Sequence, residues 1–406
     1  MTLNRFSLQR MVESITFMPQ LDLIVQMMEN QKKGHKLDLY KYQINDKFYM
    51  ILDNQDAKVC LGEDYNFIFL KKAIKDYRVG FFMRWGKTVE DNPKFSPIGP
   101  EILDIEISTN GCPNACPFCY KNNKNLPSTN MTLDIFKSII NKFPKTLTQV
   151  AFGITGIQTN PDFIPMMEYC RSIGVIPNFT LSGIDLTDEI ADKVSKVVGA
   201  LAVSAYSTNK NVCYDTVKKF TDRGIDQTNI HIMVSKETLP FVYEVLNDRL
   251  TDPRLSKMHA IVFLGVKPKG RAKNNFHSLS KEEYAKLVEV ALSKNIPFGF
   301  DSCSAPKFEA TINLMNIKDD SKKQMIQASE SCESDLFSSY INVYGEFWHC
   351  SFSEEEINQE FVDVIQAKDF FKDVWYSDTV NMFRQKSLAS EINGCRCCTV
   401  FPEINN

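Results

Sequence analysis

Three cysteines stand close together in the segment NGCPNACPFCYK, which spans residues 110–121. They are Cys112, Cys116 and Cys119, with the spacing C-x3-C-x2-C. Closed structural zinc sites and closed iron–sulfur sites use four protein ligands. Three thiolates can instead hold three irons of a [4Fe–4S] cluster and leave the fourth iron open to a ligand that is not a side chain. The spacing therefore predicts an open metal centre at which a substrate or cofactor binds.

The segments around this loop alternate between strand-like and helix-like patterns. Strands are expected at residues 101–108, 149–154, 175–181, 200–206, 229–235 and 259–266. Helices are expected at 132–143, 161–173, 188–198, 212–224 and 239–250, and a further helix (280–294) and strand (296–300) follow. Six β/α units of this length predict an α/β fold whose parallel sheet is wound into a partial, TIM-like (β/α)6 barrel. The cysteine loop follows the first strand, at the end of such a barrel where active sites lie.

The cysteine loop resembles that of the radical S-adenosylmethionine (SAM) enzymes, in which an aromatic residue usually precedes the last cysteine. Phe118 stands in that place, and Tyr120 follows the motif. The resemblance implies that SAM chelates the open iron and that one electron cleaves it to methionine and a 5′-deoxyadenosyl radical. It also implies an external electron donor such as flavodoxin or ferredoxin. A zinc knuckle that borrows His231 or His349 is the alternative interpretation.

The resemblance also suggests which residues bind SAM. After the second strand, Gly153 and Gly156 match the turn that receives the SAM amine. The glutamate of the family is absent there, so either Gln158 or backbone carbonyls are expected to serve instead. Later strands carry residues at positions that face the cofactor in relatives, and each of them could equally be an ordinary interior residue of the barrel: Asn178, Thr180, Ser204, Tyr206, His231, Met233 and Ser235.

The loop KPKGRA follows the sixth strand and is rich in basic residues. Lys267, Lys269 and Arg271 flank Gly270 there. Basic side chains at the mouth of a barrel are suited to bind a carboxylate, so Lys267 and Arg271 are candidate cofactor-binding residues. A solvated basic turn is the alternative.

The last quarter of the chain holds six of the twelve cysteines and loses the β/α rhythm. Its hairpin SSYINVYGEFWHCSF, expected to turn at Gly345, and its late cysteine pair resemble the SPASM/twitch extension of radical SAM enzymes. The resemblance implies an auxiliary [4Fe–4S] cluster with ligands from Cys332, Cys350 and Cys398, then Cys303 and Cys395. Cys397 is expected to be a spare, and a zinc ribbon is the alternative. Three further cysteines are expected in the core: Cys60, Cys170 and Cys213.

Residues 1–100 form a different, α+β segment. A helix is expected over 7–31, a hairpin turns at Asn45-Asp46, and the Pro-rich stretch 87–101 is predicted to be a linker. The sequence therefore divides into an N-terminal segment, 1–100, a barrel, 101–300, and a cysteine-rich extension, 301–406. The first of these is a candidate substrate-presenting region or lid.

Composition limits the environment and the partners of the chain. The formal net charge is -3, which gives no overall basic field for nucleic acid. No apolar run is long enough for a membrane span, and the N-terminus lacks the pattern of a signal peptide. We therefore expect a cytoplasmic protein in which clustered cysteines bind metal. A solvent-open cluster also predicts sensitivity to oxygen.

Enzymes of this architecture commonly modify ribosomally made peptides, by crosslinking or by epimerisation, and this is the leading hypothesis for function. Radical modification of a small molecule, nucleotide or sugar is the second. A non-catalytic iron–sulfur protein for electron transfer or redox sensing is the third.

Overall fold

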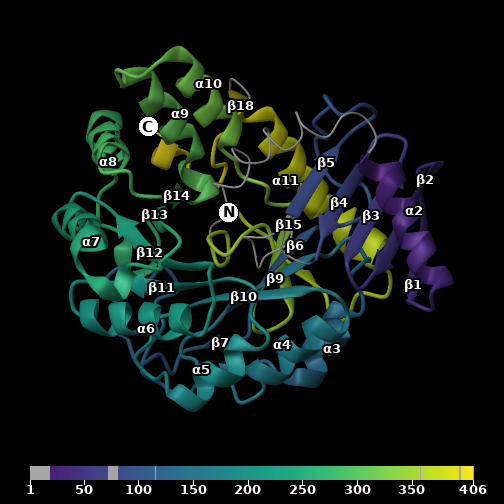
Figure 1. The fold of residues 1–406 in the computed structure, drawn as a ribbon, viewed down its shortest axis with the longest axis horizontal. Coiled ribbons are helices and arrows are strands. Elements are labelled where there is room, and N and C mark those ends of the chain that lie inside the picture. The colour runs from purple at the N-terminus through teal and green to yellow at the C-terminus, as the bar shows by residue number, and fades with distance from the viewer. Residues whose placement is uncertain (1–18, 72–80, 115, 357, 393–394, 406) are drawn as a thin grey trace.

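The computed structural model describes residues 19–71, 81–114, 116–356, 358–392 and 395–405. Two sheets organise this part of the chain. One has ten strands and contains the strands predicted between residues 101 and 300, and the other has five strands from the N-terminal region (Figure 1). Within the described ranges, no helix is long and apolar enough to cross a membrane.

The large sheet is built mainly from parallel strands that follow one another in chain order. Its strand order is β14-β13-β12-β11-β10-β9-β6-β15-β16-β17, so β14 and β17 form its two edges. Neighbouring strands from β6 to β14 are parallel, which brings the loops after them to the same end of the sheet. These strands are β6 (Ile102–Glu106), β9 (Gln149–Gly153), β10 (Ile176–Leu181), β11 (Leu201–Ala205), β12 (Thr228–Val234), β13 (Ile261–Gly265) and β14 (Phe298–Phe300).

Six helices lie on the outer side of these strands (Figure 1). Side chains of Thr132, Thr187 and Ser280 cap three of them by accepting a hydrogen bond from the backbone N–H three residues on. Every helix and strand predicted between residues 101 and 300 is present, because apolar periodicity specifies elements that share one core. The helices are α3 (Leu133–Ile140), α4 (Phe163–Ser172), α5 (Asp188–Ser195), α6 (Lys210–Asp222), α7 (Leu239–Thr251) and α8 (Lys281–Ser293).

The cysteine-rich tail adds strands to the same sheet. β15 (Ser338–Ile341) pairs in parallel with β6, and β16 (Glu346–Trp348) and β17 (Val362–Asp363) continue the sheet antiparallel. The predicted hairpin is present, and Gly345 has a φ of 84° at its turn. The tail is thus joined to the first strand of the central region. Its other elements are α9 (Ala305–Leu314), α10 (Asp319–Ala328), α11 (Asp378–Ala389), β18 (Glu391–Ile392) and β19 (Cys395–Arg396).

The described residues of the N-terminal region form an antiparallel meander and the helix α2. Asn45 and Asp46 have φ values of 48° and 64°, as a two-residue hairpin turn requires. Met27 of the helix packs beside Val59 and Ile68 of the sheet. The helix predicted over 7–31 is described only from residue 19, and residues 7–18 lie outside the described part. The elements are α2 (Pro19–Lys32), β1 (Leu37–Ile44), β2 (Lys47–Asn54), β3 (Ala57–Gly62), β4 (Asn66–Leu70) and β5 (Phe81–Trp85).

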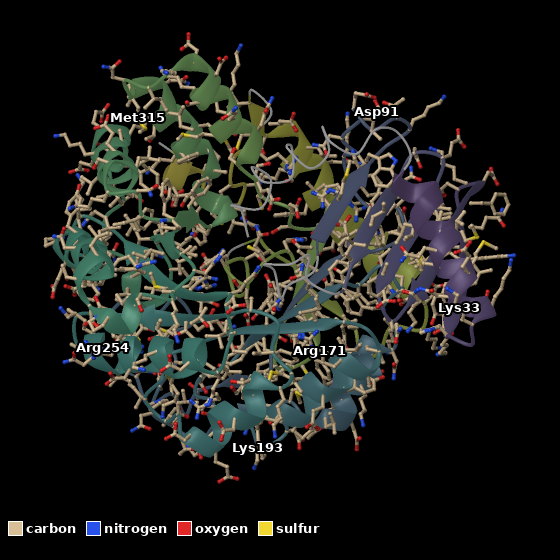
Figure 2. The ribbon with its side chains drawn as sticks, in the orientation of Figure 1. Lys33, Asp91, Arg171, Lys193, Arg254 and Met315 are labelled. Carbon is tan, nitrogen blue, oxygen red and sulfur yellow. The ribbon has the colours of Figure 1, made fainter. Side chains whose placement is uncertain are left out.

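The second half of the stretch 87–101 packs against other parts of the chain, whereas residues 87–92 are exposed. The Ser96 carbonyl accepts a hydrogen bond from Trp375 Nε1 at 2.9 Å. Glu101 is buried and pairs with Arg84 of β5 at 2.6 Å. This connection therefore docks the N-terminal sheet onto the central region and the tail. Charged side chains elsewhere extend from the outer surface (Figure 2), among them Lys33, Asp91, Arg171 and Lys193.

Candidate active site and a second cysteine cavity

A short ribbon carries the three-cysteine loop away from the sheet. β7 (Ser108–Thr109) and β8 (Thr129–Asn130) pair antiparallel just beyond β6 and hold the loop between them. Asn110 and Gly111 turn the chain with φ values of 56° and 60°. The Asn123 side chain accepts a hydrogen bond from Asn110 N at 3.1 Å. The loop is therefore anchored at its base, at the carboxyl end of β6.

The thiols of Cys112, Cys116 and Cys119 lie close together in this loop. All three are partly buried free thiols. Burial raises the pKa of Cys112 and of Cys116, and the neighbouring thiols add to the effect. Cys112 Sγ lies 3.5 Å from Thr155 O and accepts a hydrogen bond from the backbone N–H of Asn114. Free thiols that face one another, with a backbone N–H aimed at sulfur, fit the ligand set of an iron–sulfur cluster.

Arg271 holds the cysteine loop in shape from the loop after β13. Its Nε donates to Cys116 O at 2.8 Å and its Nη1 to Asn123 O at 2.8 Å. Its backbone N–H donates to Cys119 O at 3.0 Å. Arg271, which the sequence suggested as a carboxylate-binding residue, thus donates these hydrogen bonds to backbone carbonyls of the loop. Its positive charge also favours the thiolate forms of Cys112 and Cys116.

Gly270 lets the two loops approach. It has a φ of 56°, and a Cβ placed on it would overlap the carbonyl oxygens of Cys119 and Tyr120. Glycine is the residue that tolerates both the positive φ and the close backbone approach.

Aromatic rings cover one side of the thiols. Phe118 packs on Tyr206, with ring centroids 5.2 Å apart, and on Phe276, at 5.7 Å. The Tyr206 hydroxyl hydrogen-bonds to Cys116 and to Ser204. The structure thus brings Tyr206 and Ser204 to the cysteine loop, which contains Phe118.

The turn after β9 also lies at this end of the sheet. Gly153 ends the strand, and Gly156 packs against Asp185, whose carboxylate accepts a hydrogen bond from Gln158 N at 3.1 Å. The Gln158 side-chain amide donates to Asp185 O at 2.6 Å. Gln158, suggested as the substitute for the missing glutamate, therefore uses its amide within the turn. Asp185 was missed because it lies in the loop after the next strand.

The remaining inward-facing candidates lie deeper in the sheet. Asn178 donates to Gln149 Oε1 at 3.0 Å and accepts from Ala200 N at 2.8 Å, near the amino ends of the strands. Thr180 Oγ1 and His231 Nδ1 are 3.3 Å apart, and burial lowers the pKa of His231 to about 4, so the imidazole is neutral. These three line a cavity of about 270 Å³ among β9 to β14.

Met233 and Ser235 lie toward the carboxyl end of β12. Met233 is partly buried there. Ser235 is fully buried, and its hydroxyl lies 3.2 Å from that of Thr238. Ser235 therefore stabilises the start of α7.

A second cysteine group lines a cavity of about 250 Å³ between the central region and the tail. Four thiols come from separate segments and lie close enough for their charges to interact: Cys303, Cys332, Cys350 and Cys398. Burial raises the pKa of each of Cys303, Cys350 and Cys398.

Backbone N–H groups again point at the sulfurs. Cys398 Sγ accepts a hydrogen bond from Phe401 N at 3.3 Å, and Cys350 accepts from the N–H groups of Phe352 and Ser353. Four thiols around a cavity, with N–H donors to sulfur, fit a closed iron–sulfur site.

The two other tail cysteines differ in position. Cys397 lines the cavity. Cys395, suggested as a ligand, is buried, and its thiol hydrogen-bonds to Glu309 of α9.

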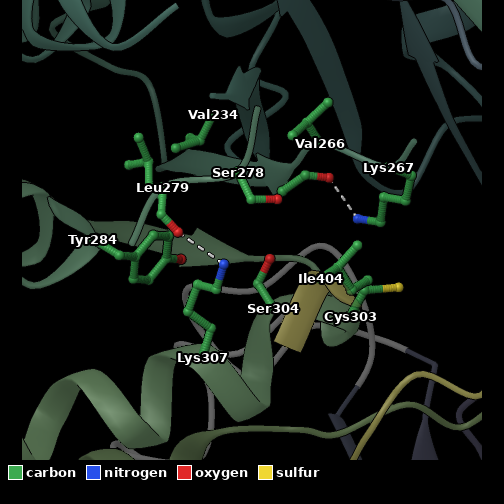
Figure 3. A pocket seen from close by; sticks show the side chains of 11 residues that line it. Val234, Val266, Lys267, Ser278, Leu279, Tyr284, Cys303, Ser304, Lys307 and Ile404 are labelled. Carbon is green, nitrogen blue, oxygen red and sulfur yellow. Dashed lines mark hydrogen bonds between the residues drawn. The ribbon is translucent and has the colours of Figure 1, made fainter. Parts of the chain in front are cut away.

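Lys267 belongs to the surroundings of this second cavity. It is buried, donates to Gly265 O at 2.8 Å and forms an ion pair with Asp301. Figure 3 shows Lys267 and Cys303 together at one side of a small neighbouring pocket. Lys267 was suggested from sequence as a carboxylate-binding residue at the mouth of the barrel; its ammonium lies beside Asp301 and Phe352.

Lys269, two residues further along, also turns to the tail. Its ammonium donates to the Glu354 carbonyl and lies 3.3 Å from Glu356.

A buried polar network joins the first loop to the tail. Lys121 pairs with Glu106 at 3.0 Å and with Glu354, and the Tyr340 hydroxyl lies 2.9 Å from Glu354. Tyr120, next to Cys119, hydrogen-bonds to Ser351 and packs on Phe352 at 4.7 Å. Sequence reasoning missed this network because its partners are far apart in the chain; the acidic run after Cys350 was the available signal.

The thiols are not gathered around a single ion. Among the described residues, no group of three or more Cys, His, Asp and Glu is close enough to hold one metal ion. A cluster with four irons lies between its ligands and lets the thiols stand further apart.

The sequence and the fold of the chain were compared with those of known proteins. No protein-family model and no curated protein sequence matches the chain. Solved structures do match: Streptococcus suis SuiB bound to its precursor peptide SuiA has a TM-score of 0.56 at 14% identity, over 76% of this chain and 71% of SuiB. Native anSMEcpe with bound AdoMet and the Cp18Cys peptide has a TM-score of 0.52 at 14% identity, over 70% of this chain and 82% of that chain.

The chain shares its fold with SuiB and anSMEcpe, which are radical SAM enzymes. The similarity extends over about two thirds or more of each protein, so it includes elements well beyond the cysteine loop. The prediction made from NGCPNACPFCYK is therefore confirmed at the level of the fold.

Proposed function

We propose that the protein is a radical SAM enzyme that cleaves SAM reductively to a 5′-deoxyadenosyl radical and abstracts hydrogen from a carbon of a ribosomally made peptide. The observation that carries the proposal is the open set of three thiols at the carboxyl end of β6 in this fold. A crosslink or an epimerised residue is the expected product.

In this proposal Cys112, Cys116 and Cys119 hold a [4Fe–4S] cluster, which when bound supplies the electron for SAM cleavage. The protein positions that centre. Arg271 fixes the carbonyls of the loop, and the Phe118–Tyr206 pair shields one side of the thiols from water.

We propose that SAM binds along the carboxyl ends of strands β9 to β12. We interpret the large sheet as a partial (β/α)6 barrel. Its seven parallel strands from β6 to β14 lie side by side in chain order, and β14 is an edge strand, so the sheet does not close. The turn around Gly153 and Gly156, with Ser204 at the carboxyl end of β11 and Tyr206 just after it, would line the side of SAM that faces the barrel.

A SPASM/twitch-like role is proposed for the tail, with one auxiliary [4Fe–4S] cluster. Its ligands would be four of the five cysteines that line the cavity, those whose charges interact: Cys303, Cys332, Cys350 and Cys398. Cys395 is left out because its thiol is bonded to Glu309.

The peptide substrate is supported by the structural neighbours. SuiB was solved with a precursor peptide and anSMEcpe with peptides. The N-terminal sheet, docked through residues 87–101, is proposed to present the substrate. A flavodoxin or ferredoxin is proposed as the electron donor.

Anaerobic reconstitution tests the proposal. With dithionite and SAM, the protein should form 5′-deoxyadenosine, and Cys116→Ala should abolish it. The matched control Cys397→Ala should form it at the wild-type rate in the absence of peptide. No 5′-deoxyadenosine from a protein that contains iron would favour the non-catalytic electron-transfer interpretation. If 5′-deoxyadenosine forms but no peptide encoded by a neighbouring gene stimulates its formation, a small-molecule substrate would be favoured.

A further inference from the structure

Lys267 is the basic residue of the tail cavity, the cavity of about 250 Å³ that the second cysteine group lines. Among the described residues that line this cavity, it is the one basic side chain, beside five cysteines and the three carboxyl side chains of Asp104, Glu330 and Glu333. Its side chain is 5% exposed, so solvent does little to screen its charge. The ammonium is therefore a poorly screened positive charge at the wall of the cavity between the thiols.

Three partners fix the direction of this ammonium. It donates to Gly265 O at 2.8 Å at the end of β13, pairs with the Asp301 carboxylate, and lies 5.0 Å from the centre of the Phe352 ring. The Asp301 carboxylate is an anionic partner for this buried ammonium, and the Gly265 carbonyl accepts one of its hydrogen bonds. The side chain therefore remains charged at neutral pH.

We propose that Lys267 sets the reduction potential of the auxiliary cluster in the tail cavity, and that Asp301 positions Lys267 and moderates its effect. This inference rests on the proposed function, because it requires a cluster held by the tail thiols. It gives Lys267 a role at the second cysteine site, away from SAM.

The sign of the effect follows from electrostatics. Reduction adds one negative charge to a site that already holds four thiolates, and a buried cation stabilises the added charge. Lys267 should therefore raise the reduction potential of the cluster. Asp301, whose carboxylate also acts on Cys303, should lower it.

Substitutions at the two partners should therefore act in opposite directions. Lys267→Met removes the cation and should lower the ratio of reduced to oxidised cluster at a fixed potential by about tenfold or more, which corresponds to a shift of about 59 mV for one electron. Asp301→Asn removes the anion and should raise the potential. Lys267→Arg keeps the charge and should stay near wild type. A role limited to packing would not produce shifts of opposite sign.

The measurement is a redox titration of the full-length protein followed by electron paramagnetic resonance. It is made in a background in which Cys112, Cys116 and Cys119 are alanine, so that only the tail cluster contributes. Lys269→Met is the matched control, because Lys269 lies in the same loop and is buried, but its ammonium contacts Glu354 and Glu356. The reduction potential of the tail cluster in Lys269→Met should equal that of the background protein.

The outcomes separate this inference from the proposed function. About four irons in the background protein, with opposite shifts for Lys267→Met and Asp301→Asn, support the inference. The same iron content with unshifted potentials, or with shifts of one sign, overturns the inference and leaves the auxiliary cluster in place. A background protein without iron overturns the inference together with the auxiliary cluster, whereas the reaction proposed at Cys112, Cys116 and Cys119 is overturned only by a lack of 5′-deoxyadenosine from the wild-type protein. If Lys267→Met does not retain its cluster, the upward shift of Asp301→Asn decides alone.

Discussion

The two cysteine sites are specified in different ways. The first takes Cys112, Cys116 and Cys119 from one loop, so their spacing alone identifies it. The second takes its four thiols from segments that meet only when β15 pairs with β6 and the chain end folds back. A site within one loop can be recognised from sequence, whereas a site assembled from distant segments requires the fold.

The comparison also separates an open site from a closed one. The first site has three thiols on a loop that Arg271 holds in place. The second site has four thiols around a cavity that also contains a buried ammonium. The open site is suited to bind a cofactor, and the closed one to hold a cluster whose properties the protein tunes.

The largest effect is expected from removing a tail ligand. Cys303→Ala should reduce iron from about eight to about four per chain, because a closed cluster requires four ligands. Cys395→Ala, the matched control, should retain about eight, since that thiol bonds to Glu309. Iron analysis with electron paramagnetic resonance measures both. Equal losses from the two variants would contradict the ligand set inferred from the cavity.

The next effect concerns the first site alone. Arg271→Met removes two charged hydrogen bonds to the cysteine loop, each worth about 1.5–3 kcal/mol. We expect partial loss of the first cluster and a fall in 5′-deoxyadenosine formation of about tenfold or more, with the tail cluster retained. Arg271→Lys should restore little, because one ammonium does not reproduce the fork that reaches Cys116 O and Asn123 O. Loss of the tail cluster in either variant would show that the sites are not independent.

Gly270→Ala should disturb the same loop more mildly. The added Cβ would overlap the carbonyls of Cys119 and Tyr120, and a positive φ disfavours alanine. We expect a loss of about 1–3 kcal/mol in the stability of the loop, seen as faster loss of the first cluster to a chelator. Gly34→Ala is the control, because it shares a positive φ but has open space around it. Equal chelation rates in Gly270→Ala and wild type would count against close packing of the two loops.

The smallest effect is expected at the contact between the sites. Tyr120→Phe removes the hydrogen bond to Ser351 and keeps the ring packed on Phe352. The holoprotein should lose about 1 kcal/mol of stability in denaturant unfolding, and both clusters should remain. A change in iron content would show that this hydrogen bond supports a cluster directly.

Sequence reasoning succeeded where information is local. Apolar periodicity predicted the helices and strands from 101 to 300, and spacing identified the cysteine loop. It did not predict that β15 extends the sheet beside β6, because strand pairing depends on distant residues. Lys267 was predicted near SAM, yet Asp301, thirty-four positions later, directs its side chain toward the tail. Cys395 was also indistinguishable from Cys303 until the fold placed Glu309 beside it.

The central claim is that the first site is open to SAM and the second is closed. Electron paramagnetic resonance of the reduced protein, recorded with and without SAM, tests it most directly. Wild-type protein with about eight irons should change its spectrum when SAM is added, and the variant lacking Cys112, Cys116 and Cys119 should retain about four irons whose spectrum SAM leaves unchanged. A SAM-dependent change in that variant, or an unchanged spectrum in wild type, would contradict the account.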